Sequence, residues 1–110
     1  MEIDYKQILK ESYEASKVIV GKSWKRVKPY AEVEFKKFVE SAVFLAKLKL
    51  AGEISEEELK QRIIIQRTSL SNVLLTIEGM ALSTAQNVVN AVLGIVAKGV
   101  FTALKVVLPI

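Results

Sequence analysis

The sequence predicts an all-α protein that folds as an antiparallel four-helix bundle. Two observations predict helices: only five Gly and two Pro interrupt the 110 residues, and apolar residues recur at steps of three and four rather than two. A strong turn signal at Gly52–Ser55 then predicts that the chain folds back near its middle. We expect a single helical domain over residues 1–110, because this length is near the common domain size.

The first predicted helix spans residues 4–27. Asp4 is the expected N-cap, with Gln7 three residues further on. Gly21 is expected to weaken this helix without breaking it. The predicted core face consists of Tyr5, Ile8, Leu9, Ser12, Ala15, Ser16, Ile19 and Trp24.

The second predicted helix spans residues 29–51. Pro29 suits its first position, where a missing N–H costs nothing, and Gly52 suits the position just after its end. The predicted core face consists of Ala31, Phe35, Phe38, Val39, Ala42, Leu45 and Ala46.

The third predicted helix, residues 56–78, has the best-defined start. Ser55 and Glu58 form a capping box pattern, and Ile54 and Leu59 form the hydrophobic staple around it. Three successive Glu in the first turn favour the positive end of the helix dipole. The predicted core face consists of Leu59, Ile63, Leu70, Val73, Leu74 and Ile77.

The fourth predicted helix spans residues 82–108, with a second capping box expected at Ser83 and Gln86. Only Gly79 argues for a break before it. A row of small or polar residues keeps one helical phase through this glycine. That row consists of Ser69, Asn72, Thr76, Gly79, Ser83, Asn87, Asn90, Gly94 and Lys98. It is expected either to face water or to line a close helix–helix contact.

The continuous phase leaves a second architecture open, a long two-helix hairpin. Helices over residues 3–51 and 56–108 would each be about 75–80 Å long at ~1.5 Å per residue. Such a hairpin could not cover its own apolar faces, so two copies would pair into a dimeric four-helix bundle. Pro29 and Gly79 do not separate the two architectures, because they lie nearly equidistant from the Gly52–Ser55 turn.

The last 32 residues, Gly79–Ile110, carry no acidic residue, and Lys98 and Lys105 are their only charges. A helix that is apolar around most of its circumference must be covered by its own chain, by a second copy or by lipid. The overall hydrophobic fraction of 51% is high for a small soluble monomer. We therefore expect a homo-oligomer or a complex with another protein. The expected interaction residues are Val88, Val92, Leu93, Val96, Val100 and Leu104.

Lipid contact is the alternative. The 21 residues Val88–Leu108 are enough to cross a bilayer, although Lys98 would lie in mid-span at a cost of a few kcal/mol. A basic stretch between Glu14 and Glu32 contains no acid and suits anionic partners, lipid headgroups foremost. Its expected binding residues are Lys22, Trp24, Lys25, Arg26 and Lys28. Its cations are few for nucleic acid, and no recognition motif accompanies them, so nucleic acid is not an expected partner.

The composition removes most catalytic chemistry. The chain has no His and no Cys, and so lacks the commonest general base, the commonest transition-metal ligand and any thiol. A ferritin-like metal site needs two Glu-x-x-His motifs and acids on all four helices, which the last helix does not supply. We expect a non-enzymatic protein without catalytic residues, metal or cofactor. The lack of Cys and the polar residues Met1–Asp4 are typical of a cytoplasmic protein, membrane-peripheral in the alternative.

Overall fold

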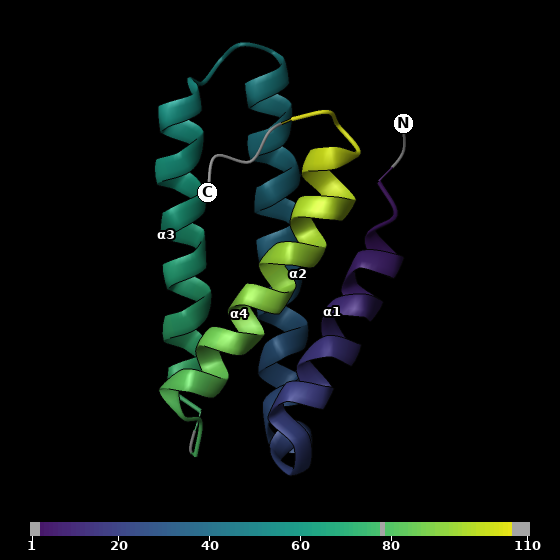
Figure 1. The fold of residues 1–110 in the computed structure, drawn as a ribbon, viewed down its shortest axis with the longest axis vertical. Helices are drawn as coiled ribbons and strands as arrows, with labels where there is room; N and C mark the ends of the chain where they lie inside the picture. The colour runs from purple at the N-terminus through teal and green to yellow at the C-terminus, as the bar shows by residue number, and fades with distance from the viewer. Residues whose placement is uncertain (1–2, 78, 107–110) are drawn as a thin grey trace.

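The computed structural model describes residues 3–77 and 79–106, and this part of the chain is all-helical, without a strand. The helices are α1 (Tyr5–Val20), α2 (Trp24–Leu50), α3 (Glu56–Leu75) and α4 (Leu82–Val96). A 3₁₀ turn, Gly21–Ser23, joins α1 to α2, and a π-helical turn, Ala97–Thr102, extends α4 (Figure 1). The predicted all-α class is confirmed.

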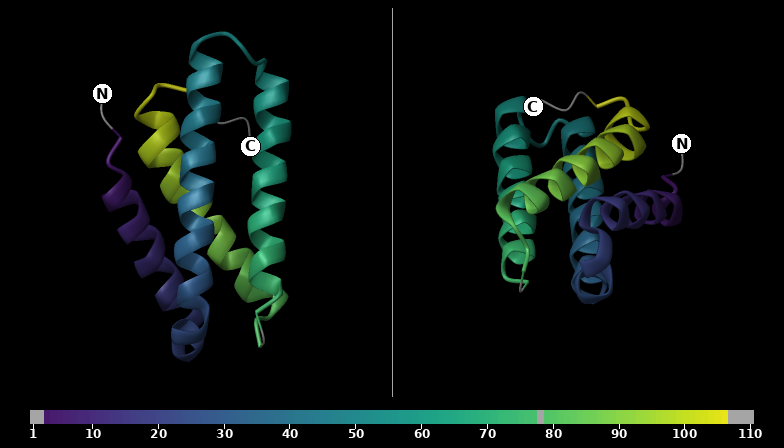
Figure 2. Two further views of the ribbon diagram at one scale, coloured as in Figure 1. Left: turned by 180° about the vertical axis from the view of Figure 1, so that it is seen from behind. Right: turned by 60° about the horizontal axis from the view of Figure 1, so that its bottom comes forward.

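The helices pack compactly, in a molecule of 43 × 25 × 18 Å. α2 and α3 form an antiparallel hairpin, and α4 crosses this hairpin obliquely on one side, from the lower end of α3 towards the N-terminal end of α1 (Figures 1 and 2). Only the 3₁₀ turn Gly21–Ser23 separates α1 from α2, so the described residues form three stretches of consecutive helical residues, and they do not form a regular antiparallel four-helix bundle. The two long helices of the alternative hairpin are not formed either, because the chain bends at Gly21 and turns before Leu82.

The bend between α1 and α2 lies at Gly21 and not at Pro29, so the predicted boundary between residues 27 and 29 is wrong. Gly21 has a φ of 70°, which reverses the chain direction and which an L side chain rarely adopts. Pro29 lies inside α2 on its exposed side. Proline fixes φ near −65°, which is helical, so at this position it removes one N–H donor without turning the chain.

The turn between α2 and α3 confirms the sequence prediction. Gly52, with a φ of 72°, ends α2: its N–H donates to the carbonyl of Lys49 at 3.1 Å, and the N–H of Glu53 donates to the carbonyl of Leu48 at 3.0 Å. This is the Schellman arrangement. The Ser55 capping box is complete, since the Glu58 N–H donates to Ser55 Oγ at 3.0 Å and the Ser55 N–H to Glu58 Oε1 at 3.3 Å.

α4 begins at Leu82, as predicted, but the cap at its start differs from the prediction. Gly79 has a φ of 83° and belongs to the turn between α3 and α4. The predicted capping box at Ser83 and Gln86 is absent, because Ala81 occupies the N-cap position and Ser83 is already helical. The helix therefore begins two residues earlier than an N-cap at Ser83 would place it, with Leu82 as its first residue.

The end of this helical stretch also differs from the prediction, which placed it at residue 108. The π-helical turn stops at Thr102, and a second Schellman arrangement follows it. The N–H of Val106 donates to the Phe101 carbonyl at 2.7 Å, and the N–H of Lys105 donates to the Thr102 carbonyl at 3.0 Å. Lys105 takes the left-handed conformation, with a φ of 57°, in the place where Gly52 stands after α2. Residues 107 and 108 of the predicted helix lie outside the described residues.

The core lies where α4 packs against the other helices. Every residue of the predicted face of the second helix is buried, and so are five of the six predicted for the third. α1 approaches the α4 stretch closely at Gly99, where an added Cβ would lie 2.7 Å from Cγ1 of Ile8. The buried hydroxyls of Ser12 and Ser16 donate to the carbonyls one turn before them, at 2.8 and 2.7 Å. The most apolar helix is therefore covered by its own chain.

Candidate interaction surfaces

The residues predicted to bind a partner through the last helix are core residues in this fold. Val88, Val92, Leu93, Val96 and Val100 are buried within the chain, and Leu104 is half-buried against the same core. They leave no apolar surface for a second molecule unless the fold opens. The sequence identified a helix that needs cover, and the other helices of the same chain provide it.

The stretch Leu82–Thr102 is long and apolar enough to cross a membrane by length and composition alone. Core helices of soluble proteins pass the same test, and this stretch contributes eight buried apolar residues to the core. Its exposed side carries Ser83, Asn87, Asn90, Gly94 and Lys98. Apart from Leu82 at the start of α4, the side left uncovered is thus the polar one, so the water-facing interpretation of this row of small and polar residues is confirmed.

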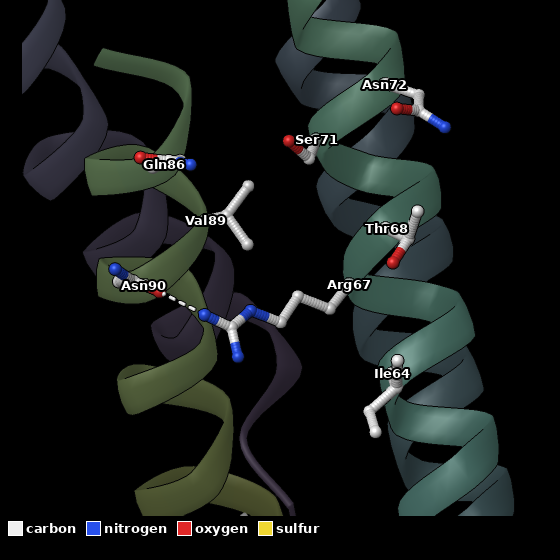
Figure 3. Close-up of a pocket in the computed structure, with 8 residues that line it drawn as sticks. All are labelled: Ile64, Arg67, Thr68, Ser71, Asn72, Gln86, Val89 and Asn90. Carbon is white, nitrogen blue, oxygen red and sulfur yellow. Dashed lines mark hydrogen bonds between the residues drawn. The ribbon is translucent and has the colours of Figure 1, made fainter. Parts of the chain in front are cut away.

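An open groove of about 520 Å³ separates α3 from α4 (Figure 3). Arg67 reaches across it, and its Nη2 donates to Oδ1 of Asn90 at 2.9 Å. Hydroxyl and amide groups line the rest, with Ile64 and Val89 as the apolar members. The lining residues are Ile64, Arg67, Thr68, Ser71, Asn72, Gln86, Val89 and Asn90. This groove is an open polar seam bridged by the Arg67–Asn90 hydrogen bond, and no carboxylate is among its lining residues.

A second groove, of about 610 Å³, runs between α1 and α4. Its floor includes Ile8, Ile95 and Gly99, and its rim carries Asp4 and Glu11 on one side with Lys98 on the other. Lys98 is exposed, like the other members of the row of small and polar residues on α4.

α2 and α3 lie side by side on the side of the molecule away from α4 (Figure 2, left). Both helices carry exposed apolar side chains. Phe44 and Ile65 are both 62% exposed and line a groove of about 200 Å³ between the two helices. We call this surface the outer face. It consists of one exposed row on α2, Tyr30, Val33, Lys37, Glu40 and Phe44, and one on α3, Glu58, Arg62, Ile65 and Ser69.

One end of the molecule gathers cations and apolar residues. The α1–α2 turn and the α3–α4 turn lie together at this end (Figure 1), and Arg26 links them, because a Cβ added at Gly79 would lie 3.4 Å from its Nη1. The predicted cations Lys22, Lys25, Arg26 and Lys28 are exposed here. Lys28 pairs with Glu32 at 3.9 Å. Trp24 is buried, so it anchors α2 in the core and does not belong to the predicted anionic-partner surface.

Tyr13 is half-buried, and its pKa is raised by burial and by the nearby Glu32 carboxylate. Its ring stacks on Phe35 with centroids 5.7 Å apart, and its hydroxyl donates to the Glu32 carbonyl at 3.4 Å. These contacts tie α1 to α2. Within residues 3–77 and 79–106, no three acidic side chains gather closely enough to hold a metal ion.

Sequence reasoning missed the outer face. Phe44 and Ile65 lie outside the predicted core faces. The signal in the sequence was that the residues of each exposed row follow one another at steps of three or four, which places them on one side of a helix. Comparison of the chain with known protein families, with curated proteins and with solved structures found no match. The function is therefore argued from these surfaces alone.

Proposed function

We propose that this protein is a non-enzymatic helical module that associates with a second copy of itself through the outer face of α2 and α3. The observation that carries the proposal is the pair Phe44 and Ile65, each 62% exposed on neighbouring helices. Large apolar side chains gathered on one face mark interaction sites more often than scattered ones do. Val33 and Tyr30 extend the apolar surface along α2.

The charges of the outer face favour a copy of the same chain. The whole protein has a formal charge of +4, which makes two copies repel weakly. The row on α2 contains Lys37 and Glu40, and the row on α3 contains Arg62 and Glu58, so each row has no net charge. A two-fold axis presents the same surface from both copies. A neutral, mixed-sign surface is suited to that arrangement.

The area of the outer face indicates how strongly two copies are expected to associate. α3 has 20 residues, which gives a length of about 30 Å, and two helices 8–10 Å apart present a strip about 20 Å wide. The strip of ~600 Å² per copy is smaller than the ~800 Å² of a standard interface. We therefore propose a reversible dimer rather than an obligate one. Two whole chains would then assemble through their α2–α3 hairpins.

The test is size-exclusion chromatography with light scattering over a range of protein concentrations. The wild-type mass should rise from one chain towards two with concentration. Phe44→Glu should hold it at one chain while the helical circular dichroism is unchanged. Leu50→Glu is the matched control, because Leu50 is 55% exposed but lies beside the α2–α3 turn. A wild type that stays monomeric throughout, or a loss of association with Leu50→Glu equal to that with Phe44→Glu, would reject the proposal.

A further inference from the structure

We infer that the end of the molecule formed by the α1–α2 and α3–α4 turns binds the surface of an anionic lipid bilayer. The turns lie at one end of the long axis (Figure 1). Between Glu14 and Glu32 the chain carries Lys17, Lys22, Lys25, Arg26 and Lys28 and no acid. We call this region the basic end. It is separate from the outer face, so the two proposals can fail independently.

Exposed apolar side chains accompany these cations. Val18, in the last turn of α1, is 83% exposed, and Leu82, the first residue of α4, is 57% exposed. Leu75, the last residue of α3, is also exposed. Apolar side chains this exposed at helix ends have no partner in the fold to shield them from water. The basic end therefore offers both interactions that hold a protein on a membrane surface, apolar insertion and attraction to anionic headgroups.

The composition favours a bilayer over a nucleic acid. A phosphate backbone attracts the lysines equally well, but it gives Val18 and Leu82 nothing apolar to enter. A bilayer accommodates both kinds of side chain when the protein lies at its surface. The lysine ammonium groups stay among the headgroups, and the short apolar side chains reach the boundary of the acyl chains. In this arrangement the molecule stands on its end, and α4 keeps its place in the core.

The experiment is co-sedimentation of the whole protein with vesicles of phosphatidylcholine alone and of phosphatidylcholine mixed with phosphatidylserine. The wild type should sediment with the anionic vesicles only. Raising the ionic strength from about 0.1 M to about 1 M should release it, because the Debye length falls from about 10 Å to about 3 Å. Lys22→Gln with Lys25→Gln should weaken binding about 30-fold, at about fivefold for each lysine near the surface. Leu82→Ser should weaken it about fivefold through lost apolar insertion.

Matched controls lie outside the basic end. Lys6→Gln with Lys10→Gln removes the same charge from exposed positions at the start of α1, and Leu50→Ser removes a side chain as exposed as Leu82. Both should bind as the wild type does. Failure of the wild type to sediment with anionic vesicles overturns the inference, as does equal weakening by the Lys6 and Lys10 pair. Tighter binding to a short DNA duplex than to vesicles, unaffected by Leu82→Ser, would assign the basic end to nucleic acid instead.

Discussion

α4 and the α2–α3 hairpin differ in how far their large apolar residues are buried. α4 is the most apolar of the four α-helices described, yet its apolar side is buried by the other helices and, apart from Leu82 at its start, its exposed side is polar. α2 and α3 are less apolar than α4, yet they leave Phe44 and Ile65 in solvent on the side away from α4. The hydropathy of a segment indicates how much apolar surface must be buried, whereas the tertiary packing determines which apolar side chains stay exposed.

The comparison is tested most severely by placing a charge in each region. Val92→Asp, in the core side of α4, buries an unpaired carboxylate and should cost about 4 kcal/mol or more, enough to unfold a small domain. Phe44→Asp, on the outer face, should change the free energy of unfolding by only ~0.5 kcal/mol. Thermal melts followed by circular dichroism measure both. A folded Val92→Asp variant with a near-normal melting temperature would contradict the placement of α4 in the core.

The two glycines of the α4 stretch distinguish its covered side from its open side. Gly99→Ala should destabilise the fold by about 1–3 kcal/mol, because the new methyl overlaps Ile8. Gly94→Ala meets no atom within 4 Å and should stabilise the helix by about 0.5–1 kcal/mol. Urea titrations give both values. Adding Ile8→Ala should make Gly99→Ala less harmful, and a purely additive double mutant would argue against the close contact.

The helix starts provide a smaller contrast. Ser55→Ala removes the capping hydrogen bond of α3 and should cost about 1 kcal/mol. Ser83→Ala, in the first turn of α4, removes no cap and should have an effect near zero or slightly favourable. Chemical denaturation of the two variants side by side tests this. Equal destabilisation by both substitutions would indicate that Ser83 caps α4, as the sequence predicted.

The helix ends give the smallest expected change. Lys105 and Gly52 occupy the same left-handed position after their helices. Lys105→Gly should therefore stabilise the protein by about 0.5–1 kcal/mol, and Gly52→Ala should destabilise it by about 1 kcal/mol. A raised melting temperature for Lys105→Gly and a lowered one for Gly52→Ala would confirm that the two residues occupy equivalent positions. A destabilised Lys105→Gly variant would contradict the Schellman end after Thr102.

The sequence predicted those elements whose cause is local. Asp4 caps α1, with its Oδ1 accepting from the Gln7 N–H at 3.0 Å, and the Gly52–Ser55 turn has the predicted hydrogen bonds. The bend at Gly21 was misplaced because proline marks a boundary in sequence statistics, while a chain reversal requires a positive φ that only the neighbouring glycine supplies easily. The sequence did not show whether Gly79 lies in a helix or in a turn. Polar residues can keep the same helical phase in one continuous helix and in two helices joined by a short turn.

The candidate surfaces were harder to predict for a physical reason. The sequence can rank segments by hydropathy, and this ranking selected Val88 to Leu104, which the fold buries. Whether Phe44 is buried depends on which side of α2 the obliquely crossing α4 covers, and that is a property of tertiary packing. The cations of the basic end were visible in sequence, but their proximity to Leu82 required the fold.

The most direct test of the account is cross-linking of single cysteines, since the natural chain has none. Phe44→Cys and Ile65→Cys variants, treated with a short bifunctional thiol reagent, should form covalent dimers, because these residues lie on the proposed two-fold surface. Leu50→Cys and Leu82→Cys, similarly exposed at the two ends of the molecule, should stay monomeric. Dimers trapped at the ends, with none trapped at residues 44 and 65, would contradict association through the outer face.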